Sequence, residues 1–218
     1  MFSCLFPPLR ICLECVQGPS FTATQSYAQF QNETRSVRLD TSHMGKFFIF
    51  LIFNKLILTF LGDEVVLLKN GQRICGVGGA LATAPILQNK AYFQVSIQQS
   101  GIFGVGVANP SVNLNSVPLS KNSWFLKEDG QLMGNSEVVG HLTEPLEEGD
   151  CIGVAFDHVD LQFYRNGLRL PLSISNIKGQ IFPMVYVDNG AILDVSFSSF
   201  GYNPPPGYEE IMLEQTIL

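Results

Sequence analysis

Clustered basic residues are what this sequence most plainly lacks. Its thirteen Lys and Arg residues are scattered among nineteen Asp and Glu residues, so the formal net charge is −6 and the isoelectric point lies near 5.0. Proteins that bind the phosphate backbone of nucleic acids group their cations on one surface. The sequence therefore argues against a nucleic acid as the partner.

A secretory signal and a disulfide framework are also missing. Pro7, Pro8 and Arg10 interrupt the apolar residues at the N-terminus, which a signal peptide would need in an unbroken run. The five cysteines are an odd number, and three of them fall within the first fifteen residues. Such spacing does not resemble a set of paired cysteines. We therefore expect a cytoplasmic, reducing location.

Motifs for catalysis or phosphate binding are absent as well. No Ser or Cys stands in a nucleophile motif near His43 or His141. Two glycine-rich stretches, "GVGG" at Gly76–Gly79 and "GIFGVG" at Gly101–Gly106, superficially resemble phosphate loops, but no helical pattern follows either one. We expect these glycines to let strands bend or approach each other closely.

Metal-ligating residues do not gather in a recognisable pattern. "DHVD", Asp157–Asp160, places a His between two carboxylates, but alternation along a strand sends neighbours to opposite faces, so we interpret it as a polar turn before a strand. Cys12 and Cys15 form only half of a zinc site. Cys75 and Cys151 fall in strand-like segments, where a buried thiol is ordinary. The sequence predicts no metal and no cofactor.

Aromatic and turn-forming residues are abundant. Aromatics make up 11% of the chain, with seventeen Phe, and there are twenty Gly and twelve Pro, whereas runs of Ala, Glu, Lys and Leu are absent. This composition favours an all-β fold. A chain of 218 residues with 46% apolar content is long enough for one domain with a sizeable core.

Apolar and polar residues alternate in three segments, which predicts strands with one buried face. The residues expected inside are Phe93, Val95, Ile97, Val159, Leu161, Phe163, Leu193, Val195 and Phe197. Asn70–Gly71 and Asn166–Gly167 favour the positive φ of two-residue hairpin turns. The predicted fold is a sandwich of two antiparallel β-sheets.

Four blocks of the sequence carry a resemblance to a known family. They read, in order, "AYFQVSIQQSGIFGVGVA", "SWFLKEDG", "GDCIGVAFDHVDLQFYRNG" and "IFPMVYVDNGAILDVSF". They resemble the SPRY domain, and the match runs from about Val37 to Phe200. The resemblance implies a sandwich that recognises other proteins through loops at one end. It also implies a flexible arm at 1–36, the domain at 37–202 and a C-terminal tail at 203–218 that packs on the domain.

The second block predicts one buried residue, and the sequence after it differs from the usual SPRY pattern. Trp124 is the only tryptophan and stands beside Phe125, so we expect it to be buried. Where SPRY domains usually carry a Tyr and a His after Asp-Gly, this chain reads "DGQLMGNS". The loop after Asp129–Gly130 is therefore not assumed to behave as it does in the family.

The resemblance also places two binding loops, one after "GVGVA" and one after "FPMVYV". The residues predicted to contact a partner are Asn109, Asn113, Asn115, Tyr186, Asp188 and Asn189. The alternative is that the Asn and Asp residues only form turns, which their side chains favour.

The predicted function is a non-catalytic module that recognises a protein or peptide. No RING, ankyrin, coiled-coil or SOCS-box-like segment flanks the blocks, so we expect an isolated recognition unit. The alternative function is an enzyme or a carbohydrate-binding protein on a lectin-like sandwich. That alternative would require convergent carboxylates or a metal cluster on a concave face.

The arm suggests a lipid modification. Cys4, Cys12 and Cys15 lie among apolar residues and are candidates for S-acylation. One acyl chain binds a membrane only marginally, whereas two or three would anchor the arm. The alternative is a disordered arm without lipid.

"KFFIFLIFNKLILTFL", Lys46–Leu61, is the most hydrophobic stretch and has no counterpart in the chains that the blocks resemble. As a helix, Phe47–Leu61 would span about 22 Å, less than the roughly 30 Å of a bilayer core. Asn54 and Lys55 would also lie at its middle, where a Lys is costly. A transmembrane span is therefore not expected, and a buried insertion would need a surface that a closed sandwich does not offer.

A retained intron is the third interpretation of this stretch, and the one that we favour. Fifteen of its sixteen residues are Lys, Phe, Ile, Leu or Asn, whose codons can consist of A and T alone. Gly45–Lys46 and Leu61–Gly62 can encode the two intron boundaries, and excision would preserve the reading frame.

Overall fold

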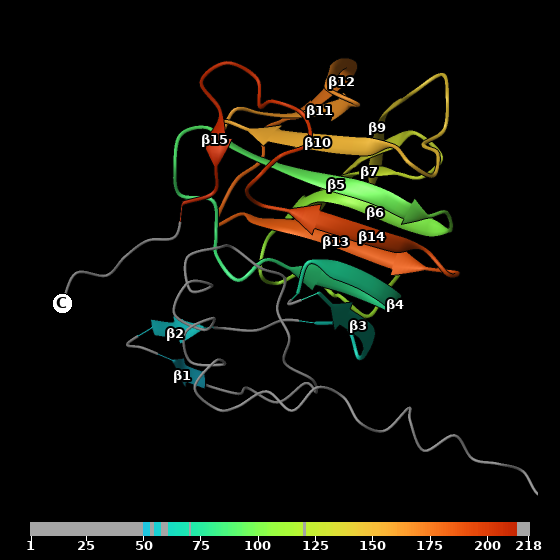
Figure 1. Cartoon of the computed structure of the whole chain (residues 1–218). Coiled ribbons are helices and arrows are strands. Elements are labelled where there is room, and N and C mark those ends of the chain that lie inside the picture. The colour runs from blue at the N-terminus through green and yellow to red at the C-terminus, as the bar shows by residue number, and fades with distance from the viewer. Residues whose placement is uncertain (1–49, 53–54, 58–60, 70, 120, 213–218) are drawn as a thin grey trace, which may run out of the picture. The chain divides into compact units, whose positions relative to one another are not determined.

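The computed structural model describes residues 50–52, 55–57, 61–69, 71–119 and 121–212. Within these residues the strands from Glu64 onward form a sandwich of two sheets, and no helix occurs (Figure 1). Neighbouring strands of the sandwich are antiparallel except where the short last strand joins it. The predicted all-β fold with two antiparallel sheets is confirmed.

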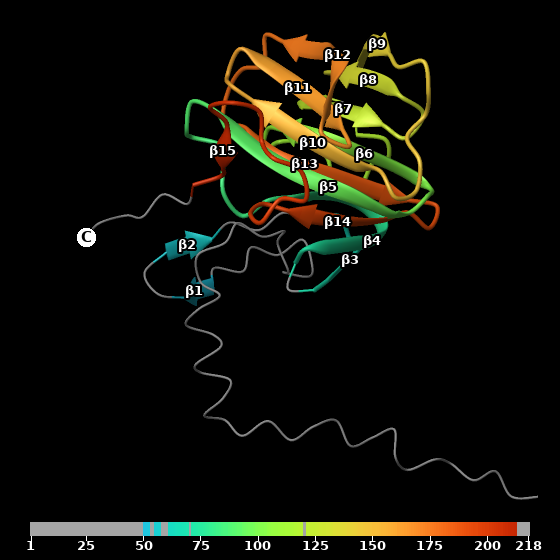
Figure 2. The same ribbon diagram turned by 45° about the horizontal axis from the view of Figure 1, so that its top comes forward.

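The two layers, named sheet I and sheet II, share one strand and can be followed in Figure 2. Sheet I contains, in spatial order, the second half of β4 (Arg73–Leu81), β13 (Phe182–Asp188), β6 (Ile102–Ala108), β7 (Ser123–Lys127), β8 (Gln131–Gly134) and β9 (Glu137–His141). Sheet II contains β3 (Glu64–Leu68), the first half of β4, β14 (Ile192–Ser196), β5 (Ala91–Gln99), β10 (Cys151–Phe156), β11 (Asp160–Arg165) and β12 (Leu168–Ser175). β15 (Glu209–Glu210) runs parallel to the start of β5.

β4 passes from one sheet to the other at its glycines. Arg73 and Ile74 pair with β14, whereas Gly78 and the residues after it pair with β13. Between these two pairings Gly76 has φ 96° and Gly78 has φ 128°. L-residues with a side chain rarely adopt such angles. The prediction that the "GVGG" glycines let a strand bend is therefore confirmed.

The predicted inward residues form the core between the sheets, with one exception. Eight of the nine are at most 4% exposed, including Phe93, Leu161 and Phe197. The prediction for Val159 was wrong, because this residue lies in the turn before β11 and is 66% exposed. The alternation of apolar and polar residues continues into this turn, before the strand itself begins at Asp160.

The hairpin turns agree with the prediction in one of two places. Asn166 (φ 52°) and Gly167 (φ 82°) join β11 to β12 as a two-residue turn. Between β3 and β4, however, Leu68 pairs with Arg73, so the connection has four residues rather than two. The prediction for Asn70–Gly71 was therefore wrong in length.

Two aromatic neighbours on β7 differ in burial. Phe125 is 0% exposed, whereas Trp124 is only partly buried at the margin of the core. The expectation that Trp124 is buried was therefore met only in part, because Trp124 faces the central core at its margin, whereas Phe125 points to the opposite face of the strand. Phe125 instead packs on the outer face of sheet I.

Other segments of the chain cover the outer faces of both sheets. On sheet I, the connection 109–122 between β6 and β7 buries Val112, Leu114 and Leu119 in a second apolar cluster with Phe125 and Met184. On sheet II, the residues after β14 cross the outer face and end in β15. The sandwich therefore has a central core and a covering layer on each side.

The hydrophobic segment at 46–61 is described only in part. Within it, β1 (Phe50–Ile52) and β2 (Lys55–Ile57) pair with each other as a separate sheet. Leu61 forms a β-bridge with Ala80 and packs against the core, so this residue belongs to the sandwich although the sequence grouped it with the insertion. The remaining residues of the segment, like Cys4, Cys12 and Cys15, lie outside the described residues. In the described part of the chain no helix is long and apolar enough to cross a membrane.

Candidate functional site

The candidate site lies on the outer face of sheet I, where β13 ends and β6 begins. Alternation along β13 turns Met184, Tyr186 and Asp188 outward. The register places Tyr186 beside Gly104, which pairs with Lys127 on β7, and places Asp188 beside Ile102. We call the surface formed by Ile102, Lys127, Glu128, Asp129, Tyr186, Asp188 and Asn189 the Asp188 face.

The turn that carries Asp188 is held in one conformation. Asn189 (φ 48°) and Gly190 (φ 80°) occupy the left-handed region, and Asp188 Oδ1 accepts a hydrogen bond of 2.6 Å from the Asn189 N–H. The Gln99 side chain donates a further bond of 2.8 Å to the Gly190 carbonyl. Asn and Gly are the residues that tolerate these angles, so turn geometry accounts for the backbone at 189 and leaves the Asp188 carboxylate at the surface.

Tyr186 is buried rather than exposed beside this turn. It is 0% exposed, its ring lies over Gly104, and it meets Phe125 edge to face at 5.2 Å between ring centroids. A side chain on Gly104 would overlap the ring, so glycine permits this close approach. In the part of the chain that the structure describes, the Tyr186 hydroxyl has no hydrogen-bond partner. Tyr186 therefore forms the floor of the predicted contact surface.

Charged groups surround the buried hydroxyl. Burial raises the pKa of Tyr186, and the negative charges of Glu128 and Asp129 raise it further. Glu128 accepts a hydrogen bond from the Phe103 N–H at 3.3 Å, and Asp129 forms an ion pair of 2.9 Å with Lys127. Burial alone would raise the pKa of Asp129, but bonds from Lys127 and the Gln131 N–H outweigh it and lower that pKa. Asp129 is therefore ionised at neutral pH.

The connection 109–122 starts at the opposite end of β6 and folds back toward this face. Ala108 pairs with Phe182, so Asn109 lies at the far end of the strands from Asp188. Its amide donates to the Lys178 and Gln180 carbonyls at 3.2 and 3.0 Å. The structure therefore does not bring Asn109 to the Asp188 face.

The other two asparagines of this connection lie on its returning part. Asn113 Oδ1 accepts a bond from the Asn115 N–H, and Asn115 exchanges two hydrogen bonds with Asp63, at 2.7 and 2.9 Å. The intervening Leu114 carbonyl accepts the Gly79 N–H at 2.8 Å, and Gly79 pairs with Tyr186. Asn115 therefore lies beside the strand next to Tyr186, with its side chain already bonded within the chain.

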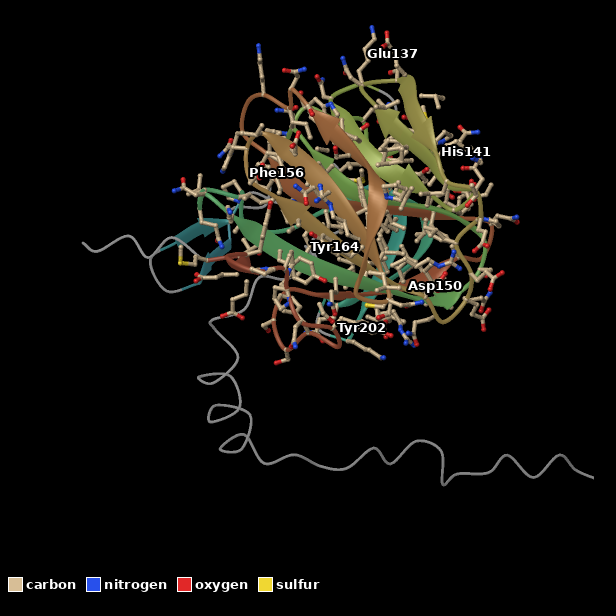
Figure 3. The ribbon with its side chains drawn as sticks, turned by 90° about the horizontal axis from the view of Figure 1, so that it is seen from above. Glu137, His141, Asp150, Phe156, Tyr164 and Tyr202 are labelled. Atoms are coloured by element: carbon tan, nitrogen blue, oxygen red, sulfur yellow. The ribbon has the colours of Figure 1, made fainter. Side chains whose placement is uncertain are left out.

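A bonded polar network lies just before β10 of sheet II. Asp150, labelled in Figure 3, accepts bonds from Arg165 at 2.7 Å, the Asn166 amide at 2.8 Å and the Glu147 N–H at 2.9 Å. Glu137 and His141 mark the two ends of β9, at the edge of sheet I (Figure 3). No three His, Cys, Asp or Glu side chains in the described ranges are grouped so as to hold a metal ion.

Comparisons with known proteins identify the family. A family model of the SPRY domain matches residues 90–200. SPRY domain-containing protein 7 of Homo sapiens and of Bos taurus are each 44% identical to the chain over 189 residues, covering 85% of this chain and 88% of those proteins. The chain belongs to the SPRY domain family. The protein of the same description from Gallus gallus is 47% identical over 161 residues, covering 72% of this chain and 82% of that protein.

Solved SPRY domains share the fold. The SPRY domain of human HERC1 superposes with a TM-score of 0.53 at 19% identity, covering 62% of this chain and 94% of that chain. The TRIM65 PSpry domain superposes with a TM-score of 0.55 at 16% identity, covering 84% and 100%. SPRY domains generally serve as protein-interaction modules.

Proposed function

We propose that this SPRY domain is a non-catalytic interaction module that binds a protein or peptide through the Asp188 face. The observation that carries the proposal is the change in character along the outer face of sheet I. Under the connection 109–122 this face is apolar and sealed, whereas at its Asp188 end it becomes polar around a fixed turn. A rigid scaffold that presents polar groups on a fixed turn suits recognition.

The carboxylates of this face have structural partners that suit binding better than catalysis. Glu128 accepts a hydrogen bond from the Phe103 N–H, and Asp129 accepts hydrogen bonds from Lys127 and from the Gln131 N–H. An enzyme or lectin would need such groups to converge on a bound substrate. The proposed role is that of a cytoplasmic adaptor, and S-acylation of Cys4, Cys12 and Cys15 remains a separate prediction for the arm.

The test replaces the recognition groups without disturbing the turn. In the double variant Asp188→Asn with Asn189→Gly, the new amide oxygen still accepts the N–H of residue 189, and glycine adopts the positive φ. We expect affinity enrichment from cells, quantified by mass spectrometry, to lose partners that the unchanged chain captures, while the melting temperature stays the same.

A matched control alters the far end of the sandwich. Asn176 is exposed with φ 63°, and Glu209 is exposed on β15. The double variant Asn176→Gly with Glu209→Gln makes the same kinds of change and should retain all captured partners. If the Asp188 and Asn189 variant folds and still captures them, the binding surface lies elsewhere.

A further inference from the structure

We propose that the Asp188 face accepts a basic side chain, a Lys or an Arg of the partner, beside the Tyr186 hydroxyl. This inference rests on the proposed function and names the chemistry of the partner at that site. It depends on two independent observations, an excess of negative charge on the face and a buried hydroxyl without a partner.

The negative charge gathers around the start of β6. Asp188 lies beside Ile102 on one side of the strand, and Glu128 lies on the other side, where its carboxylate accepts the Phe103 N–H. With neighbouring strands about 4.8 Å apart, the backbones at Asp188 and Glu128 are roughly 10 Å from each other. Asp129 adds a third carboxylate, and Lys127 is the cation paired with it. Three carboxylates and one ammonium leave two negative charges on this small surface.

The Tyr186 hydroxyl provides the second observation. Buried hydroxyl groups almost always have a hydrogen-bond partner, and leaving one unpaired destabilises the fold. Phenylalanine would fill the same space over Gly104 and against Phe125 without that cost. Packing therefore explains the ring of Tyr186 but not its oxygen.

The position of this oxygen suits a ligand that donates hydrogen bonds. The ring lies over Gly104, the residue that pairs with Lys127, so its hydroxyl points across β6 toward the turn at Glu128 and Asp129. Ile102, which is half-buried, packs at the rim of the apolar cluster that contains Tyr186. An ammonium or guanidinium group that displaces Ile102 can donate to the hydroxyl oxygen while it neutralises the carboxylates. An acidic ligand would meet two uncompensated negative charges.

The experiment uses peptides of random sequence displayed on phage and selected on the full chain. We expect the enriched peptides to share a Lys or Arg. Synthetic copies in which that residue is replaced by Gln should bind about 10-fold more weakly, as expected for the loss of a charged hydrogen bond. Asp188→Asn and Tyr186→Phe should each weaken the basic peptide, and Tyr186→Phe should also raise the melting temperature.

Glu209→Gln is the matched control, because it removes one negative charge at the far end of the sandwich. It should leave peptide affinity unchanged. An equal loss of affinity in this variant and in Asp188→Asn would overturn the inference in favour of general charge attraction. Enriched peptides without a basic residue, or a Tyr186→Phe variant that binds as well as the unchanged chain, would also overturn it and leave the proposed function standing. Failure to enrich any peptide would count against both.

Discussion

The outer faces of the two sheets are both covered by other parts of the chain, but the buried polar groups on these two faces differ in whether they are hydrogen-bonded. Beneath the C-terminal segment on sheet II, Gln94 is 2% exposed, accepts the Gly201 N–H at 2.9 Å and donates to the Tyr202 carbonyl and the Tyr92 hydroxyl at 2.6 and 2.8 Å. On sheet I, the hydroxyl of the equally buried Tyr186 has no partner in the described residues.

This difference is the one expected between a structural cover and the proposed recognition surface. A fully bonded polar group under a cover fixes where that cover lies, because displacing the cover breaks several hydrogen bonds at once. Gln94 acts in this way, and so does Tyr208, whose hydroxyl donates to Asp157 at 3.0 Å. The Tyr186 hydroxyl forms no hydrogen bond in the described residues, so it does not fix the position of a cover. The comparison therefore supports a stabilising role for the sheet II cover, and it is consistent with the proposal that the Asp188 end of sheet I binds a partner.

The largest expected effect concerns the apolar cluster under the sheet I cover. Phe125→Ala should reduce the free energy of unfolding by about 3–5 kcal/mol, because it leaves a cavity between Tyr186 and the connection 109–122. Trp124→Ala, on the same strand but only partly buried, should cost less. Chemical denaturation of both variants provides the measurement. A larger loss for the Trp124 variant would mean that the two faces of β7 have been assigned the wrong way round.

A smaller loss is expected from the polar anchor under the sheet II cover. Gln94→Ala should reduce the free energy of unfolding by about 2–3 kcal/mol, since it removes the buried amide that bonds the N–H groups of Gly201 and Tyr202, the Tyr202 carbonyl and the Tyr92 hydroxyl. Gln98→Ala is the control, because Gln98 lies on the same face of β5 but is exposed. It should change the stability by less than about 0.5 kcal/mol. Equal losses in the two variants would show that the bonds of Gln94 do not anchor the cover.

Local sequence patterns predicted the strands but not the covers. Alternation identified the buried faces at Phe93 and Leu193 because period two reflects the backbone of a single strand. It could not show that Gln94, on the opposite face of β5, is buried too, since the covering residues lie more than one hundred positions later in the chain. The same limitation applies to Tyr186, which alternation assigns to an outer face without revealing that its ring is buried there in a second apolar cluster.

Acid below about pH 4 should loosen the sheet II cover before the sheet I cover. Burial acts to raise the pKa of Asp157, but the N–H groups of Asp160 and Val159 and the Tyr208 hydroxyl outweigh it, so this pKa lies below its ordinary value. A lowered folded pKa means that the contribution to stability is complete above the unfolded value, near pH 4, and is lost as the pH falls through the folded value. The main-chain amides of residues 208–212 should therefore lose hydrogen-exchange protection with falling pH before those of residues 112–114.

The variant Asp157→Asn is the control for this pH dependence. The amide oxygen can accept the bonds from the Val159 and Asp160 N–H groups, and the amide NH2 can donate to the Tyr208 oxygen, but the side chain does not titrate in this range. The difference between the two covers should therefore disappear in the variant. If both covers of the unchanged chain lose protection in parallel, Asp157 is not the group that pins the C-terminal segment.

The smallest effect is expected at the junction of the hydrophobic segment with the sheet I cover. The Gly62 N–H donates to the Gly79 carbonyl at 3.0 Å, and the Gly79 N–H donates to the Leu114 carbonyl at 2.8 Å, so the chain around Leu61 supports that cover. If residues 46–61 are a retained intron or a dispensable insertion, a variant without residues 46–60, which keeps Leu61, should melt no lower than the full chain and be more soluble. Removing residues 46–61 should lower the free energy of unfolding by about 1 kcal/mol more, because Leu61 is half-buried against the core.

Sequencing of transcripts across this junction tests the intron hypothesis independently. Messages that always contain the segment, together with a 46–60 deletion that fails to fold, would rule it out.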